Sequence, residues 1–448
     1  MEKKLLTMEK TVNIIGGGLA GVECANLLAR YGFKVNLFEM KPKKFSPAHK
    51  SSMLGEIVCS NSLKNTDKLT SSGLLKAEME RFGSLILQTA QKTSVPAGGA
   101  LAVDREMFSS KIDKSIRSNK NITVVAKEIT ALPVESEEIW VVATGPLTSD
   151  GLYQDIKQKL GDDGLYFFDA SAPIVLGESV DKDSAFKQDR YGDLGSGDYL
   201  NCPMTKDEYT NFYNELINAE RAKLHEFEKK EIFEGCMPIE IMASRGEDSL
   251  RYGPLKPVGL GRHLPYKPHA IVQLRKENLD EECYNLVGFQ TNLKFQEQKR
   301  VFSLIPALRN AEFIKYGVMH RNSYLNSPRH LSKRLNLTKF PNIYIAGQLS
   351  GVEGYVESAA SGMMVALSII LNDAGRPFAL GSETMLGALA EYITNPANAD
   401  NFQPMNSNYG IIKELENKSR DKKENRSKIY ERSMQQIDKF IKENNLCN

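Results

Sequence analysis

The sequence predicts an α/β fold in which a parallel sheet is assembled from both ends of the chain. Near the N-terminus, a β-branched run at 12–15 meets glycines in a G-x-G-x-x-G spacing and leads into a helical segment. A second strand, 34–38, ends at Glu39, 18 residues after Gly21. Much later, 342–362 again reads as a strand, a glycine turn and a helix. These features together indicate a Rossmann-like domain that binds a dinucleotide.

The glycine spacing has a physical reason at each position. Gly16, Gly18 and Gly21 permit a tight turn with positive φ, a close backbone approach to a pyrophosphate, and close packing of the helix on the strand. The helix N-terminus then offers N–H groups to the phosphates. Glu39 can accept hydrogen bonds from both ribose hydroxyls, which argues against a 2′-phosphate. The alternative is a glycine-rich turn in an ordinary α/β unit.

Composition sets limits on the class of protein. With 448 residues the chain suggests two or three domains, and 41% hydrophobic with 25% charged residues is usual for a soluble globular protein. The net charge of +2 means that any nucleic-acid surface must be a local patch. We expect neither a secretory signal nor a membrane-spanning helix. Six cysteines without a C-x-x-C pair suggest reduced thiols in the cytoplasm, with no disulfide scaffold and no zinc or other metal site.

Secondary structure is expected in the following order through the first half of the chain. A polar segment follows the second strand and reads as an ordered loop over the cofactor, because it is rich in Ser and Asn and lacks periodicity. Helices and strands then alternate. The expected elements are a loop at 41–70, a helix at 73–91, a helix from Asp104, and strands at 122–125 and 138–145.

The domain boundaries follow from the two strand-to-glycine junctions. We expect a discontinuous nucleotide-binding domain at 8–200 and 322–412, with an α/β insertion at 201–321. The late strand and helix, whose N-terminus would face an isoalloxazine ring, favour FAD over NAD. Thr205 and Glu208 predict a capping box that starts a helix running to about residue 230.

The last segment, 413–448, is predicted to be a charged amphipathic helix. Its apolar residues Tyr430, Met434, Ile437 and Ile441 have helical spacing. We expect this helix to dock on the body of the protein, with RNA contact as the second interpretation.

A basic stretch at 251–276 is the one candidate RNA-binding segment of the insertion. It holds six Lys or Arg residues and no acid, interleaved with tyrosines, histidines and four prolines. Cations bind phosphates and aromatic rings stack on unpaired bases. A solvated basic loop is the alternative. The candidate RNA contacts are Arg251, Lys256, Arg262, Lys267 and Arg275.

Two cysteines, Cys59 and Cys236, lie in polar, glycine-containing surroundings and are the candidate reactive thiols. Cys24 is expected to be a buried structural residue. A reactive thiolate needs nearby positive charge or a helix N-terminus. Candidates by sequence proximity alone are His49, Lys64 and Arg245.

The chain resembles the folate- and FAD-dependent RNA (uracil-5-)-methyltransferases, the TrmFO family. The resemblance covers most of the chain, and the dinucleotide fingerprint alone is shared with the relative GidA/MnmG. It rests on the blocks GGGLAGVE, PAHKSSMLGEIVCSNSLK, NCPMTKDEY, FEGCMPIEIMASRG, YGPLKPVGL, NLVGFQTNLKFQEQKRVFSLIPALRNAEFIKYGVMHRNSYLNSP, AGQLSGVEGYVESAASG and FQPMNSNYG.

The resemblance implies methylation of carbon 5 of a uridine, with 5,10-methylenetetrahydrofolate as carbon donor, reduced FAD as reductant, and NADH or NADPH to reduce the flavin. It implies catalytic roles for Cys59 and Cys236. Our hypothesis is that Cys236 attacks the uracil while Cys59 acts beside the flavin as a base or protects the flavin-bound carbon; the reverse assignment stays open. His320 is a tentative folate contact, with a surface or core histidine as the alternative.

The expected cofactor contacts combine the glycine pattern with the family resemblance. They are Gly16, Gly17, Gly18, Leu19, Ala20, Gly21, Glu39, Lys41, Gly145, Gly347, Gln348, Gly351, Val352 and Tyr355.

The chain departs from the family pattern in two places. Lys41 stands where the family usually has arginine, which removes a planar bidentate donor. The loop GLGRHLPYKPHA is more basic than usual. The resemblance implies the T-loop uridine of tRNA as the first target, and these departures make a 23S ribosomal RNA uridine the second.

Two other functions compete with RNA methylation. One is a GidA-like enzyme of wobble uridines, which would need a longer helical C-terminal domain. The other is a non-catalytic FAD-containing RNA-binding protein. Neither a membrane nor an obligate protein partner is expected.

Overall fold

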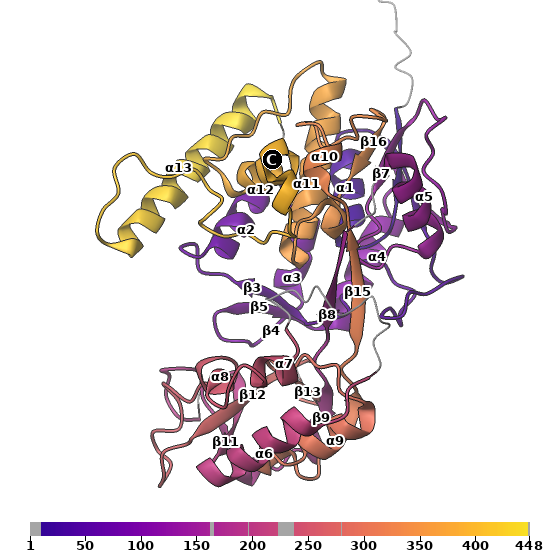
Figure 1. The fold of residues 1–448 in the computed structure, drawn as a ribbon. Helices are drawn as coiled ribbons and strands as arrows, with labels where there is room; N and C mark the ends of the chain where they lie inside the picture. Colours follow the sequence, from indigo (N-terminus) through magenta and orange to yellow (C-terminus); the bar gives the residue numbers. More distant parts are fainter. Residues whose placement is uncertain (1–9, 162–164, 196, 223–236, 279, 447–448) are drawn as a thin grey trace, which may run out of the picture.

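The molecule has two parts, which we call the upper and the lower body after their places in Figure 1. A five-stranded parallel sheet forms the centre of the upper body. The computed structural model describes residues 10–161, 165–195, 197–222, 237–278 and 280–446. The strand order is β16-β7-β1-β2-β6. Their bounds are β1 Thr11–Ile15, β2 Lys34–Glu39, β6 Ile122–Ala126, β7 Ile139–Val142 and β16 Ile343–Ile345. Because β16 comes from the distant C-terminal part, the predicted α/β class and the assembly of the sheet from both ends are confirmed.

Alternating side chains of β1 face two different cores, as the period of a strand requires. Val12 and Ile14 pack in the larger core with helices α1 (Leu19–Arg30) and α11 (Tyr355–Asp373), whereas Ile15 packs with α5 (Asp150–Leu160) on the other face. The helices of this body are α1 Leu19–Arg30, α2 Ser71–Arg81, α3 Leu85–Lys92, α4 Arg105–Arg117, α5 Asp150–Leu160, α10 Ser327–His330, α11 Tyr355–Asp373, α12 Met385–Thr394 and α13 Lys422–Glu443.

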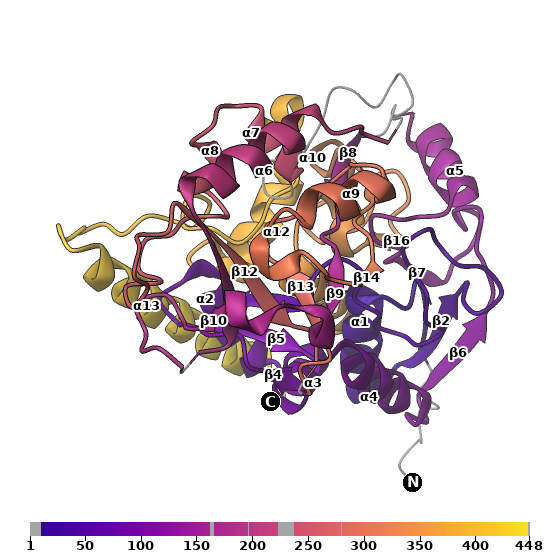
Figure 2. The same ribbon diagram turned by 90° about the horizontal axis from the view of Figure 1, so that it is seen from below.

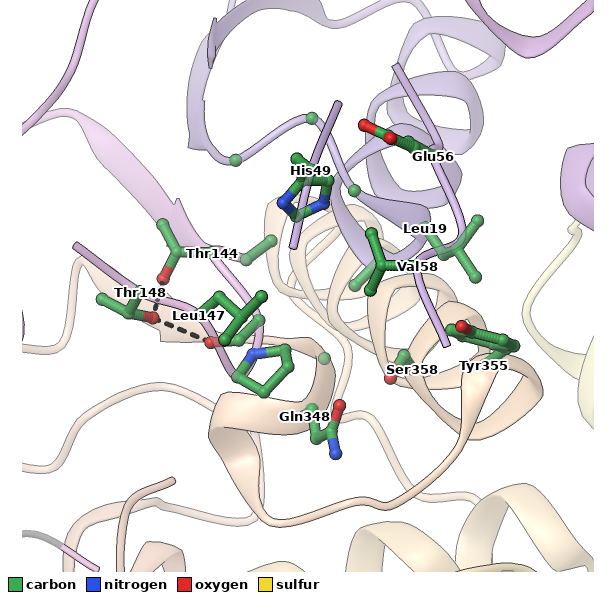
Figure 3. Close-up of a pocket in the computed structure, with 18 of the residues that line it drawn as sticks. Leu19, His49, Glu56, Val58, Thr144, Leu147, Thr148, Gln348, Tyr355 and Ser358 are labelled. Atoms are coloured by element: carbon green, nitrogen blue, oxygen red, sulfur yellow. Dashed lines mark hydrogen bonds between the residues drawn. The ribbon is translucent and has the colours of Figure 1, made fainter. Parts of the chain in front are cut away.

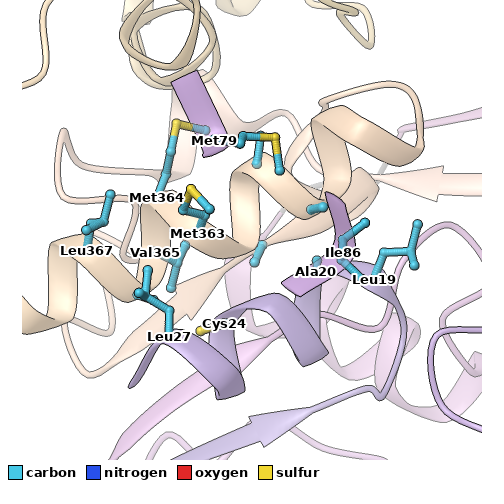
Figure 4. Close-up of a cluster of buried hydrophobic side chains, with 14 of the residues drawn as sticks. Leu19, Ala20, Cys24, Leu27, Met79, Ile86, Met363, Met364, Val365 and Leu367 are labelled. Atoms are coloured by element: carbon cyan, nitrogen blue, oxygen red, sulfur yellow. The ribbon is translucent and has the colours of Figure 1, made fainter. Parts of the chain in front are cut away.

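Helices α1 and α11 cross in backbone contact, and small residues make this possible. A Cβ on Gly362 of α11 would lie 2.1 Å from the carbonyl oxygen of Ala20 of α1. Within the N-terminal unit, a Cβ on Gly21 would lie 1.9 Å from the carbonyl oxygen of Gly16, so the start of α1 also packs closely on the glycine loop. Figure 4 shows Cys24 of α1 beside Leu27, in the same buried cluster as the methionines of α11, as expected for a structural cysteine. Among the described residues, α11 is the one helix long and apolar enough to cross a membrane, and 83% of its apolar window is buried inside the protein.

A second, six-stranded sheet forms the lower body in the order β10-β11-β12-β13-β9-β14 (Figures 1 and 2). All of its pairings are antiparallel. The strands are β9 Ile174–Leu176, β10 Phe186–Lys187, β11 Tyr199–Met204, β12 Ala270–Lys276, β13 Cys283–Leu286 and β14 Phe313–Lys315. The helices are α6 Lys206–Asn218, α7 Ile239–Ala243, α8 Ser249–Tyr252 and α9 Phe295–Phe302. Strands β9 and β10 precede residue 201, the expected start of the insertion. Because both pair with strands of the insertion, the lower body begins earlier in the chain than expected.

Two small sheets connect and flank these bodies. Strands β8 Leu165–Ala170 and β15 Met319–Tyr324 pair in antiparallel fashion and run between the two bodies (Figure 1). Strands β3 Ser62–Asn65, β4 Ser94–Val95 and β5 Ala100–Val103 form a three-stranded sheet. The segment 41–70, expected to be a loop, therefore contains the strand β3.

Two expected helices differ in extent from the structure. The single helix expected at 73–91 is two helices, because Gly83 adopts φ +69° and Arg30 donates to the carbonyl oxygens of Phe82 and Gly83. The helix with the predicted Thr205 capping box ends at Asn218, well before 230. There the chain turns so that the N–H of Ala222 reaches Asn292.

The C-terminal helix α13 docks on the body, as expected. It lies beside α2 in both views (Figures 1 and 2) and buries Met434, Ile437 and Phe440. Phe440 meets the ring of Phe82 edge-on, with centroids 6.3 Å apart. The hydroxyl of Ser433, also in α13, donates to the buried carboxylate of Glu78 in α2.

Candidate cofactor and catalytic site

A cavity of about 420 Å³ opens at the carboxyl ends of the parallel strands. Its lining comes from the glycine loop before α1, the end of β2, the turn after β7 and the start of α11. Figure 3 shows labelled side chains from the start of α1, the segment 49–58, the turn after β7 and the start of α11 gathered around one space. This position, outside the carboxyl ends of a parallel sheet, is where ligands of such folds bind.

The glycine loop forms one wall of the cavity. Gly16 adopts φ +105°, and a Cβ on Gly17 would lie 2.4 Å from Leu54 and 2.8 Å from the Glu39 carboxylate. Helix α1 begins after Gly18 with no side-chain cap and no acidic residue in its first turn. Its first N–H groups are thus offered to an anion in the cavity. Of the predicted contacts here, Gly16, Gly17, Gly18, Leu19 and Ala20 line the cavity, and Gly21 packs behind it.

Glu39 and Lys41 occupy the end of β2. The buried Glu39 carboxylate accepts the N–H of Gly17 at 2.8 Å and that of Lys41 at 3.0 Å. The Lys41 ammonium, also buried, donates to the carbonyl oxygen of Met53 at 2.7 Å and to Glu56 at 3.2 Å. Lys41 therefore fixes the position of the segment that contains Met53 and Glu56. Glu39 and Lys41 both line the cavity.

His49, noted in the sequence only for its closeness to Cys59, also lines the cavity. Its Nδ1 shares a 2.6 Å hydrogen bond with Ser46. Burial, and then the Lys41 ammonium, lower the pKa of His49. Lys64 lines the cavity as well, whereas Arg245 is exposed and does not.

The far wall is built from the turns after β7 and β16. Gly145, Gly347, Gln348 and Tyr355 line the cavity. Thr148 closes the first turn by donating to the carbonyl oxygen of Gly145 at 2.8 Å (Figure 3). Helix α11 starts after Gly354 with no side-chain cap, so a second helix N-terminus faces the same space.

Gly351 and Val352 were predicted as contacts but lie behind this wall. A Cβ on Gly351, at φ +84°, would lie 2.3 Å from the Phe402 ring. Val352 is fully buried and bridges to Met405. We therefore regard them as support for the wall, not as contacts.

Cys59 is partly buried and lines the cavity. Its N–H donates to the hydroxyl of Tyr355 at 2.8 Å, and its carbonyl oxygen accepts from Arg105 at 2.9 Å. Burial raises the pKa of Tyr355, so its hydroxyl keeps its proton. The Lys315 ammonium donates to the carbonyl oxygen of the neighbouring Val58. Neither Arg105 nor Lys315 was identified from the sequence as a site residue. Lys315 does lie inside a quoted motif block, NAEFIKYGVMH, which was the available signal.

Two predicted residues are not tested by the geometry. Cys236 lies outside the described residues. His320 lies in β15, and its side chain is also outside them. Asn322, in the same strand, lines the cavity.

The basic segment is an exposed surface of the lower body. Lys256, Arg262 and Lys267 are exposed, and within the described part of the chain no ion-pair partner is found for them. Tyr252, 81% exposed, lies nearby in sequence. Half-buried Arg251 donates to the carbonyl oxygen of His269 at 3.0 Å and pairs with Asp248.

Arg275 corrects the sequence prediction, because it is buried. Its guanidinium donates to Asn61 at 2.9 Å and to Ser60 at 2.9 Å. These contacts join β12 to the loop that carries Cys59, so Arg275 is no longer a candidate RNA contact.

Sequence comparison places the chain among known proteins. Residues 11–377 match the family described as glucose inhibited division protein A. A methylenetetrahydrofolate–tRNA-(uracil-5-)-methyltransferase TrmFO of Caldicellulosiruptor bescii is 54% identical over 425 residues, covering 94% of this chain and 96% of the relative. Proteins of the same name from Ligilactobacillus salivarius and Fusobacterium nucleatum are 51% and 50% identical, each over 97% of this chain and 99% and 100% of the relative.

Solved structures agree with this fold. GidA of Aquifex aeolicus superposes with a TM-score of 0.69 in one crystal form and 0.70 in another, at 15% and 16% identity. The alignments cover 99% and 98% of this chain and 75% and 77% of the GidA chains. At this identity the likeness concerns the fold.

Proposed function

The chain belongs to the TrmFO family within the wider GidA group, and on this premise we propose that it methylates carbon 5 of a uridine in tRNA. Methylenetetrahydrofolate is the proposed carbon donor and reduced FAD the reductant, with NADH or NADPH reducing the flavin. The observation that carries the proposal is that Cys59 shares one cavity with the glycine loop and two uncapped helix N-termini. The cysteine proposed to react and the loop proposed to hold the dinucleotide thus line the same cavity.

The residues around the cavity suit FAD. The N-terminus of α1, which has no side-chain cap and no acidic residue in its first turn, can bind a pyrophosphate through its N–H groups, while the N-terminus of α11 would face the isoalloxazine ring. Each oxygen of the Glu39 carboxylate accepts one N–H and keeps a lone pair for a ribose hydroxyl. The absence of a Cβ at Gly17 leaves the Glu39 carboxylate in place. When bound, FAD would supply the hydride equivalent that completes a methyl group.

The two cysteines have separate proposed roles. Carbon 5 of uracil becomes nucleophilic once a thiolate adds to carbon 6, and we assign this addition to Cys236. Cys59, on the cavity wall, then acts as the base that removes the carbon-5 proton or protects the reactive carbon from water. His320 is the proposed folate contact.

The substrate is proposed to bind partly on the basic segment of the lower body. Its exposed cations have no protein anion to neutralise them in the described chain, which suits phosphates. We expect the reaction to occur in the cytoplasm and to need no obligate protein partner.

Covalent trapping tests the assignment of the cysteines. RNA containing 5-fluorouridine at the target should form a covalent complex with the full chain and methylenetetrahydrofolate, and with Cys59→Ala, but not with Cys236→Ala. A complex retained by Cys236→Ala would contradict the assignment.

Analysis of cellular RNA tests the target. RNA from a strain lacking the gene should lose 5-methyluridine in tRNA. Loss in ribosomal RNA alone would replace the tRNA target. Loss in neither would favour wobble-uridine chemistry, if that modification disappears, or a non-catalytic RNA-binding role.

A further inference from the structure

The segment 57–61, which we call the Cys59 loop, is held on the cavity wall by the upper body. Arg105, the first residue of α4, donates to the carbonyl oxygens of Ile57 at 3.2 Å and Cys59 at 2.9 Å. The Tyr355 hydroxyl accepts the Cys59 N–H at 2.8 Å. The backbone of Cys59 is therefore bonded on both sides by side chains from helices far apart in sequence.

The lower body holds the same loop through two more cations. Lys315, the last residue of β14, donates from Nζ to the carbonyl oxygen of Val58 at 2.9 Å. Arg275 of β12 donates to the side chains of Ser60 and Asn61. The Cys59 loop is therefore a junction at which both bodies meet.

Two cations, Arg105 and Lys315, interact electrostatically with Cys59. Burial, followed by the Arg105 guanidinium, lowers the pKa of Lys315 to about 8, while Cys59 and Glu277 act in the opposite direction. At pH 7 the Lys315 ammonium therefore predominates. Glu277 is already paired with Arg105, and Lys50 is a further positive charge that acts on Lys315.

We propose that Lys315 is a positioning residue that keeps the Cys59 thiol ionised at neutral pH, from a strand of the lower body. A neighbouring cation favours the thiolate over the thiol, and the hydrogen bond to Val58 holds the Lys315 ammonium beside the residue that precedes Cys59. The proton that leaves the sulfur goes to solvent. The role of the thiolate in methyl transfer rests on the proposed function. Its ionisation does not, because that needs neither folate nor RNA.

Alkylation of Cys59 across pH tests this inference directly. The full chain, with its flavin and after flavin removal, is treated with iodoacetamide from pH 5 to 10, and modification is followed by mass spectrometry of the Cys59 peptide. In Lys315→Met the midpoint of the pH profile should rise by about one unit, which lowers the alkylation rate roughly tenfold at pH values well below the wild-type midpoint and by a smaller factor at pH 7. Lys315→Arg should restore the midpoint, and Lys299→Met, a loss of exposed charge on α9, should leave it unchanged.

Internal controls separate this effect from unfolding. Cys24 and Cys202 are fully buried, and burial raises the pKa of both thiols, so their alkylation reports an opened structure. An unchanged midpoint in a folded Lys315→Met protein would overturn the inference. So would failure of Lys315→Arg to restore it, or inert Cys59 in both flavin states. Methyl transfer can fail without affecting this profile, so the two proposals are tested separately.

Discussion

Gly17 is the residue whose replacement most directly disturbs the cofactor cradle. In Gly17→Ala the new Cβ would approach Leu54 and the Glu39 carboxylate within 3 Å, so the carboxylate must move from its position beneath the glycine loop. We expect the purified variant to lose most of its bound flavin, measured as visible absorbance per protein. Its thermal unfolding should still be cooperative. Wild-type flavin content in Gly17→Ala would contradict the assignment of the cradle.

Among the single residues of the candidate site, the sequence predicted those that belong to a local pattern. The glycine spacing and Glu39 are separated by fewer than 25 residues and could be placed without a structure. Arg105, Arg275 and Lys315 could not, because each reaches the Cys59 loop from a distant part of the chain. Arg275 was assigned to RNA because charge density is visible in a sequence whereas burial is not.

Buried glutamates at helix starts connect the elements of the upper body. The Glu78 carboxylate accepts the first N–H groups of α12, from Met385 at 2.7 Å and Leu386 at 2.8 Å, and a hydroxyl of α13. Burial raises the pKa of Glu78 to about 7, despite these hydrogen bonds. Glu23 caps α3 in the same way, and burial also raises its pKa to about 7.

This shift predicts a pH dependence of stability. Between pH 4.5 and 7 the folded protein holds the Glu78 proton while the unfolded chain has released it, so the free energy of unfolding falls as pH rises. Each such glutamate contributes at most about 3 kcal/mol. Denaturant unfolding of Glu78→Gln should show a shallower decline than wild type, and Glu391→Gln, an exposed change on α12, should not. Identical slopes for all three proteins would contradict the protonated state of Glu78.

The basic segment makes a prediction about RNA affinity. Replacing Lys256, Arg262 and Lys267 together by alanine should weaken tRNA binding and reduce the salt slope of log affinity by about two to three, because each phosphate contact contributes about one. Filter binding across salt concentrations measures both quantities. A matched triple change of exposed lysines on and beside α4 provides the control: Lys111, Lys114 and Lys120. Equal slopes for both triple variants would remove the segment from the RNA surface.

Elements were predictable where their signals are local. The capping box at Thr205 and the periodicity of α13 were both read correctly. The break between α2 and α3 was missed because Glu23 and Arg30 of α1 fix it through tertiary contacts. Helix propensity alone does not contain that information.

On the scale of the whole molecule, the sequence predicted a sheet assembled from both chain ends, because both ends carry a strand followed by glycines. It placed the start of the insertion too late, since the short strands β9 and β10 have little pattern before they pair with β13, β14 and β11. The sequence also did not predict that the two bodies meet at the Cys59 loop. That junction places a candidate thiol, a glycine cradle and a lower-body cation around one cavity.

The most direct test of the account follows the methyl carbon. The purified full chain is incubated with a tRNA transcript, NADH or NADPH, and methylenetetrahydrofolate carrying heavy carbon in its methylene group, and the digested RNA is analysed by mass spectrometry. We predict 5-methyluridine containing the heavy carbon, dependent on both folate and bound flavin. Flavin-loaded protein that yields no heavy 5-methyluridine, on tRNA or ribosomal RNA, would contradict the proposed function.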